Sequence, residues 1–172
     1  MKKLLRFLLK PLSFAPALII MYCIYSFSAQ DGTASSNMSY QVSYKVIELT
    51  DRVFNLDLTD AQILQGIRRI HFYVRKTAHF SEYFLLAASI ACPLYVYGIR
   101  GIWLILTSGL ICVGFASLDE FHQLYVSGRS GSIRDVCIDS TGAFTGILIT
   151  NIFCYIGRKT IFEPLICHHE KR

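Results

Sequence analysis

Charged side chains are scarce in this chain of 172 residues, of which only 17% are Asp, Glu, Lys or Arg. In soluble domains roughly a quarter of the residues carry charge. The hydrophobic residues make up 53% of the chain and fall in long blocks, which excludes an ordinary soluble domain and predicts a membrane protein. The net charge of +5 does not indicate nucleic-acid binding, because the basic residues stand beside apolar blocks rather than on one polar face.

Common catalytic and metal-binding motifs are also missing from the sequence. It contains no HExxH and no GxSxG motif, and its 6 cysteines form no CxxC pair. Most of the cysteines lie inside apolar blocks, where cysteine behaves as a small hydrophobic residue, so disulfide or redox chemistry is not expected. No internal repeat or low-complexity tract divides the chain.

Long apolar runs predict an all-α, polytopic membrane protein with four transmembrane helices. The expected spans cover residues 11–29, 77–97, 101–123 and 135–157. Each is close to the ~20 residues that cross a bilayer core. Gly142 and Gly146 form a GxxxG spacing in the last span, which allows close approach of a neighbouring helix. We expect one membrane domain over residues 1–160 and a short basic cytoplasmic tail over 161–172.

The distribution of basic residues around the first span predicts the topology. Four of them, Lys2, Lys3, Arg6 and Lys10, precede this span, and the next basic residue is Lys45. Positive charge is retained on the cytoplasmic side, so both termini are expected in the cytoplasm. The first apolar run is longer than the core of about 7–15 residues in a signal peptide, which favours a retained helix over a cleaved one.

The segment Gln30–Val74 is expected to form the first outer loop. Asp31-Gly32 and residues 35–37 predict a turn or flexible loop. Two apolar stripes then recur at helical spacing, Val42, Val46, Leu49 and Val53 in the first and Ile63, Ile67, Ile70 and Val74 in the second. Thr59 and Gln62 fit a capping box ahead of the second stripe. These patterns predict one or two short amphipathic helices on the outer membrane surface or over the bundle, with a mostly soluble loop as the alternative.

Ionisable residues gather near one boundary of the predicted spans. At a rise of about 1.5 Å per residue, His79 lies roughly 28 Å from Gly98, Asp119 roughly 27 Å from Gly101 and Asp139 roughly 27 Å from Gly157. All three therefore reach the outer boundary of a core about 30 Å thick. Charged residues at such a depth indicate a functional site. The expected ligand-binding residues are Arg75, Lys76, His79, Glu82, Tyr83, Asp119, Glu120, Gln123, Arg129, Asp135 and Asp139.

Three chemistries fit this cluster, and a purely structural network that holds the helices in register is the alternative to all of them. The basic side chains Arg75, Lys76 and Arg129 are suited to hold a phosphate or carboxylate. Candidates for general acid–base catalysis on a lipid headgroup are His79, Glu82, Asp119 and Glu120. The same four residues together with His122 are candidate ligands for a divalent metal, which the other two chemistries do not require.

Four segments carry a resemblance to the VanZ-like family of small bacterial membrane proteins. They are YSFSAQDG, RKTAHFSEY, SLDEFHQ and GRSGSIRDVCIDSTGAFTG, in the family's order. The family pattern extends to Lys76, His79, Glu82, Tyr83, Asp119, Glu120, Gln123, Arg129 and Asp135. The chain departs from it at Asp139, where the family usually has asparagine, and at Ser127, where it tends to have proline.

The resemblance implies a multi-pass protein of the bacterial plasma membrane. The namesake of the family is associated with resistance to teicoplanin-type glycopeptide antibiotics. We therefore expect an outer-leaflet site that binds an anionic lipid or cell-wall precursor, with the bilayer and such a ligand as partners and no nucleic acid. An intramembrane hydrolase or transferase acting on a lipid headgroup is the alternative, so whether the protein is an enzyme stays open.

Overall fold

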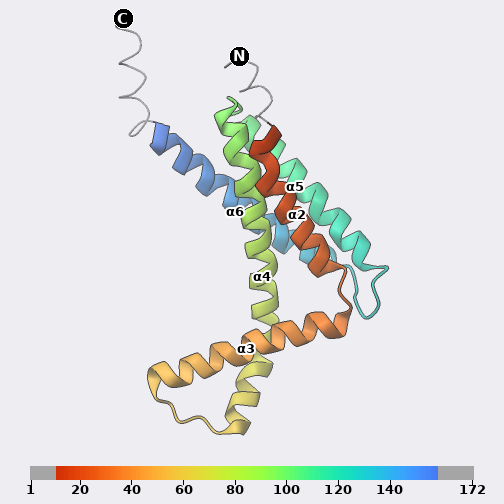
Figure 1. The fold of residues 1–172 in the computed structure, drawn as a ribbon, viewed down its shortest axis with the longest axis vertical. Coiled ribbons are helices and arrows are strands. Elements are labelled where there is room, and N and C mark those ends of the chain that lie inside the picture. Colours follow the sequence, from red (N-terminus) through yellow and green to blue (C-terminus); the bar gives the residue numbers. More distant parts are fainter. Residues whose placement is uncertain (1–10, 159–172) are drawn as a thin grey trace, which may run out of the picture.

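The computed structural model describes residues 11–158, which form helices and, within this range, no strand (Figure 1). The elements are the 3₁₀ helix η1 (Pro11–Phe14), α2 (Ala15–Ser28), α3 (Gly32–Phe54), α4 (Asp60–Val96), α5 (Ile102–Gln123) and α6 (Ile133–Gly157). The all-α prediction is confirmed. The basic N-terminal residues 1–10 and the predicted tail 161–172 lie outside the described residues.

Three helical segments are long and apolar enough to cross a membrane. They are Pro11–Ser28, Ile102–Gln123 and Ile133–Gly157, close to three of the four predicted spans. The other predicted span, 77–97, is the C-terminal part of α4, where His79 and Glu82 interrupt the apolar run. A total of four spans therefore stays a prediction.

Helix α4 is the central element and contacts each of the other helices. Its buried side chains, among them Tyr83, Leu86 and Ala87, form much of the core. α6 packs directly against α4, because a Cβ atom at Gly142 or Gly146 would overlap the carbonyl oxygen of Phe80 or Phe84. The predicted role of the GxxxG spacing in close helix approach is confirmed.

The prediction of short separate helices in the first outer loop is wrong. α3 extends over 23 residues, and the second amphipathic segment is the beginning of the 37-residue helix α4. No glycine or proline stands between Gly66 and Pro93, so nothing stops the helix before it enters the bundle. The predicted helix start is confirmed, since the Thr59 backbone N–H donates to Gln62 Oε1 at 2.9 Å.

Residues 35–37, predicted as a loop, belong to the first turns of α3. Asp31 is the reason, because its Oδ1 accepts a hydrogen bond from the Ala34 backbone N–H at 2.7 Å and caps the helix. The Thr33 hydroxyl also donates to this carboxylate, and the two hydrogen bonds lower the pKa of Asp31 below its ordinary value. The local cap therefore overrides the low helix preference of the serines.

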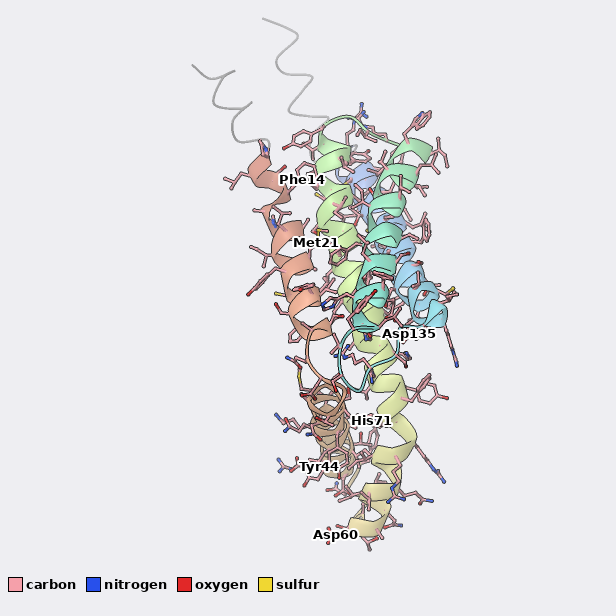
Figure 2. The ribbon with its side chains drawn as sticks, turned by 90° about the vertical axis from the view of Figure 1, so that its right-hand side faces the viewer. Phe14, Met21, Tyr44, Asp60, His71 and Asp135 are labelled. Carbon is pink, nitrogen blue, oxygen red and sulfur yellow. The ribbon has the colours of Figure 1, made fainter. Side chains whose placement is uncertain are left out.

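The chain passes α2, α4, α5 and α6 in alternating directions, so residues 11 and 158 lie at the same end of the bundle (Figure 1). The α2–α3 turn and the loop 124–132 lie at the opposite end, which we call the site end. α3 runs across α4 just beyond the site end (Figure 1). Figure 2 shows Asp135 at this end, with His71, Tyr44 and Asp60 progressively farther from the bundle.

Candidate functional site

A cavity of about 170 Å³ opens at the site end of the bundle. Arg75, His79 and Glu82 reach it from α4, Asp119 from α5 and Arg129 from the loop 124–132. Its other polar lining comes from the end of α2 and the start of α3, and consists of Ser28, Gln30, Ser35 and Ser39. Side chains from four helices and one loop therefore meet at a single opening, a geometry suited to a small polar group.

The loop 124–132 is attached to the end of α2 by backbone contacts. Arg129 Nη2 donates to the carbonyl oxygen of Phe27 at 2.8 Å, and the Gly32 N–H donates to the carbonyl oxygen of Ser127 at 3.0 Å. Gly128 adopts a left-handed conformation with φ of 70°, which favours glycine. A Cβ atom at Gly32 would overlap the Gly128 carbonyl, so the two backbones touch. These contacts hold the loop so that Arg129 lines the cavity.

Two arginine side chains share the cavity and have unused hydrogen-bonding capacity. Arg75 makes no hydrogen bond or ion pair with any residue in 11–158, and Arg129 Nε is buried without a partner there. Burial lowers the pKa of Arg129, and the nearby positive charge of Arg75 acts in the same direction. Two guanidinium groups that repel each other at one opening are poised to share an anion.

A buried hydrogen-bonded group lies behind the cavity wall on α5. The backbone N–H of Ser132 donates to Glu120 Oε2 at 2.8 Å. Gln123 Nε2 donates to both Glu120 Oε1 and Asp119 Oδ2, each at 3.3 Å. Asp119, Glu120 and Gln123 are 2–4% exposed. Asp119 thus faces the cavity while Glu120 anchors the start of α6, and the Gln123 amide links the two carboxylates.

A second polar group lies in the interface between α4 and α6. Lys76 Nζ and Asp135 Oδ1 form an ion pair at 2.5 Å, with both side chains 18% exposed. His79 Nδ1 lies 3.7 Å from Asp139 Oδ1, too far for a hydrogen bond. Asp139 is fully buried, and neither of its carboxylate oxygens has a hydrogen-bond partner in the described part of the chain. At this position, where the family usually has asparagine, the chain therefore has a tightly packed carboxylate whose hydrogen-bonding capacity is unused within the described residues.

The structure divides the predicted ligand residues into two sets. Those that line the cavity are Arg75, His79, Glu82, Asp119 and Arg129. Those that lie behind its wall, within or between the helices, are Lys76, Tyr83, Glu120, Gln123, Asp135 and Asp139. His122 is also outside the cavity, and its ring packs on Tyr25 with 4.9 Å between ring centroids.

The predicted metal ligands do not form a metal-binding group. In residues 11–158, no three or more His, Cys, Asp or Glu side chains are grouped so as to hold an ion. His79, Glu82 and Asp119 share the cavity, whereas Glu120 and His122 point to other surroundings.

The sequence analysis missed the contribution of α3 to the cavity. Ser35 and Ser39 line it, and the Ser39 hydroxyl donates to the carbonyl oxygen of Ser35 at 3.2 Å. Ser43 repeats the pattern one turn later, with its hydroxyl 2.7 Å from the carbonyl oxygen of Ser39. These serines are four residues apart, so they lie on one side of a helix. Small polar side chains on one side allow another helix to pack closely against it.

These features define an all-helical membrane protein with a polar cavity at one end of its bundle. The model of the VanZ/LLP1 family matches residues 13–154, which include almost all of the described helices. The chain belongs to the VanZ/LLP1 family, and the resemblance seen in the four sequence segments is confirmed. No curated protein and no solved structure matches the chain.

Proposed function

We propose that the cavity binds the anionic headgroup of a lipid or cell-wall precursor at the membrane boundary. Through this binding the protein contributes to resistance against teicoplanin-type glycopeptide antibiotics, as membership of the VanZ/LLP1 family suggests. One observation carries the proposal: Arg75 and Arg129 line the same cavity, and Arg75 has no ionic or hydrogen-bond partner among residues 11–158. A phosphate fits between two guanidinium groups, each of which offers two parallel donors.

The carboxylates of Glu82 and Asp119 on the same cavity wall restrict the ligand further. They repel a bare anion but accept hydrogen bonds from hydroxyl or amine groups. Lipid headgroups and sugar-bearing precursors carry such groups beside their phosphate. A ligand with one phosphate and neighbouring hydrogen-bond donors therefore complements both the arginines and the carboxylates of the lining.

The Arg75→Gln variant tests the binding site, because Arg75 has no hydrogen-bond or ionic partner to lose among residues 11–158. Short-chain phosphatidylglycerol is titrated into the full chain in detergent and binding is measured calorimetrically. We expect roughly 10-fold or greater weakening, since hydrogen bonds to a charged group contribute about 1.5–3 kcal/mol. Teicoplanin susceptibility of cells that produce the variant should change in parallel.

The matched control for this experiment is Arg69→Gln, which removes an exposed arginine of α4 outside the cavity. It should leave binding and susceptibility unchanged. Equal affinity of the Arg75→Gln and natural proteins, at equal thermal stability, would contradict the proposed site. Equal affinity for short-chain phosphatidylcholine would show that the cavity does not select an anionic headgroup.

We further propose that the protein lies in a bacterial plasma membrane with both termini in the cytoplasm and the site end outside. Single cysteines at Ser130 and Arg100, placed in a variant without its natural cysteines, test this orientation, because these exposed residues lie in the loops at opposite ends of the bundle. An impermeant thiol reagent should label Ser130→Cys in intact cells and Arg100→Cys only in inverted vesicles. The reverse pattern would mean that the site end faces the cytoplasm.

A further inference from the structure

α3 carries an apolar stripe that the rest of the described chain leaves uncovered. The exposed fractions are 45% for Met38, 49% for Val42, 46% for Val46, 63% for Leu49 and 62% for Val53. At about 100° per residue, these five side chains lie within a sector of about 80° around the helix. Such a stripe on a helix is unusual in water unless something apolar covers it.

The stripe is not the side of α3 that packs on α4. That side carries Ser43 and Ile47, which are buried, and Ile47 contacts Gly66 of α4. His71 of α4 lies 3.2 Å from the Ser36 carbonyl oxygen on the same side. Ile47 points about 140° away from the centre of the stripe, so intramolecular packing and the stripe use different sides of the helix. In the second apolar stripe, on α4, Ile67 is only 2% exposed, whereas every member of the first stripe on α3 is exposed.

The residues that line the cavity show which way the stripe faces. Ser35 and Met38 line the cavity at the site end, and both fall inside the sector of the stripe. This side of α3 therefore points toward the bundle. Because α3 runs across α4 and extends sideways beyond the bundle (Figure 1), the later residues Val46, Leu49 and Val53 point toward the layer beside the spanning helices.

We propose that α3 is a membrane-interface helix, and that its apolar stripe docks on the surface of the lipid bilayer around the bundle. Phe27 of α2 and Met38 border the same cavity and are 43% and 45% exposed, so the apolar surface continues from a spanning helix onto α3. Charged residues lie on other sides of α3, among them the exposed ion pair between Arg52 and Glu48 at 2.7 Å. This division of apolar and charged sides is the pattern of helices that lie in the interface plane.

Tryptophan fluorescence of the full chain in vesicles tests the proposal. The natural Trp103 is first replaced by phenylalanine, which leaves no tryptophan in the chain. Val46→Trp and Leu49→Trp then report on the stripe, while Tyr44→Trp is the matched control, because Tyr44 is 44% exposed and points about 160° from the stripe centre. The vesicles contain phosphatidylcholine and phosphatidylglycerol with either natural or brominated acyl chains.

We expect the two stripe tryptophans to lose most of their fluorescence in brominated vesicles, and the Tyr44→Trp signal to be quenched by aqueous iodide instead. Quenching of the stripe tryptophans by iodide to the same extent as the control would overturn the proposal. Protection from both quenchers would also overturn it, since a second copy of the chain would then cover the stripe. A nitroxide on Val42→Cys gives an independent measurement, and should collide with oxygen more often than with an aqueous nickel complex.

Discussion

Replacement of Gly142 by leucine should prevent stable packing of α6 against α4. A Cβ atom at this position would overlap the Phe80 carbonyl oxygen, which is part of the α4 backbone and has no rotamer to change. The helices would have to move apart along the most extensive contact in the bundle. We expect a loss of roughly 3 kcal/mol or more, the upper end of what overpacking does in a core. Thermal or denaturant unfolding of the purified protein measures it.

Gly114→Leu is the control for this substitution. Gly114 also lies within an apolar helix, α5, but a Cβ atom there would meet no atom of another described segment within 4 Å. Both substitutions replace glycine with a strong helix former, which by itself stabilises a helix by about 1 kcal/mol. Gly114→Leu should therefore be neutral or slightly stabilising. If the two variants unfold alike, α6 does not depend on contact between the backbones of Gly142 and Phe80.

The parts of the fold that the sequence predicted are those with a local cause. Apolar length fixes the limits of α5 and α6, and the Thr59–Gln62 pair marks the start of α4. The continuity of α4 from its amphipathic start into the bundle was not predictable from composition, because polarity changes midway along it. The absence of glycine and proline between Gly66 and Pro93 permits one continuous helix, and α3, α5 and α6 pack against it.

The sequence predicted how far along their helices the site residues lie, but not which way their side chains point. Counting residues at a fixed rise placed His79 and Asp119 at one level, and both line the cavity. The same count could not separate Lys76 and Glu120 from the cavity, because the direction of a side chain depends on how each helix is rotated against its neighbours. The part played by α3 was missed for another reason, since Ser35 became helical only through the Asp31 cap.

Lys76→Met should destabilise the protein because it leaves Asp135 mostly buried without its partner. Removal of one member of a fully buried pair costs about 3–5 kcal/mol, and we expect roughly 2–3 kcal/mol here because both side chains remain 18% exposed. Asp135 lies in the first turn of α6, whose dipole offsets part of this loss. Unfolding of the reconstituted protein gives the measurement. The double variant Lys76→Met with Asp135→Asn should recover most of the stability, because no uncompensated charge is then left.

The ion pair Arg52–Glu48 is a control that shows whether burial or a short distance makes the Lys76–Asp135 pair important for stability. Its nitrogen and oxygen lie 2.7 Å apart, close to the 2.5 Å of Lys76–Asp135, but its side chains are 74% and 41% exposed. Water screens such a pair, so Arg52→Met should change the unfolding free energy by only about 0–1 kcal/mol. If Lys76→Met is equally mild, or if the double variant is no more stable than the single one, Asp135 is solvated in the folded protein. In that case the polar group between α4 and α6 would not depend on Lys76 for its stability, and the helix interface would rest on glycine-mediated packing alone.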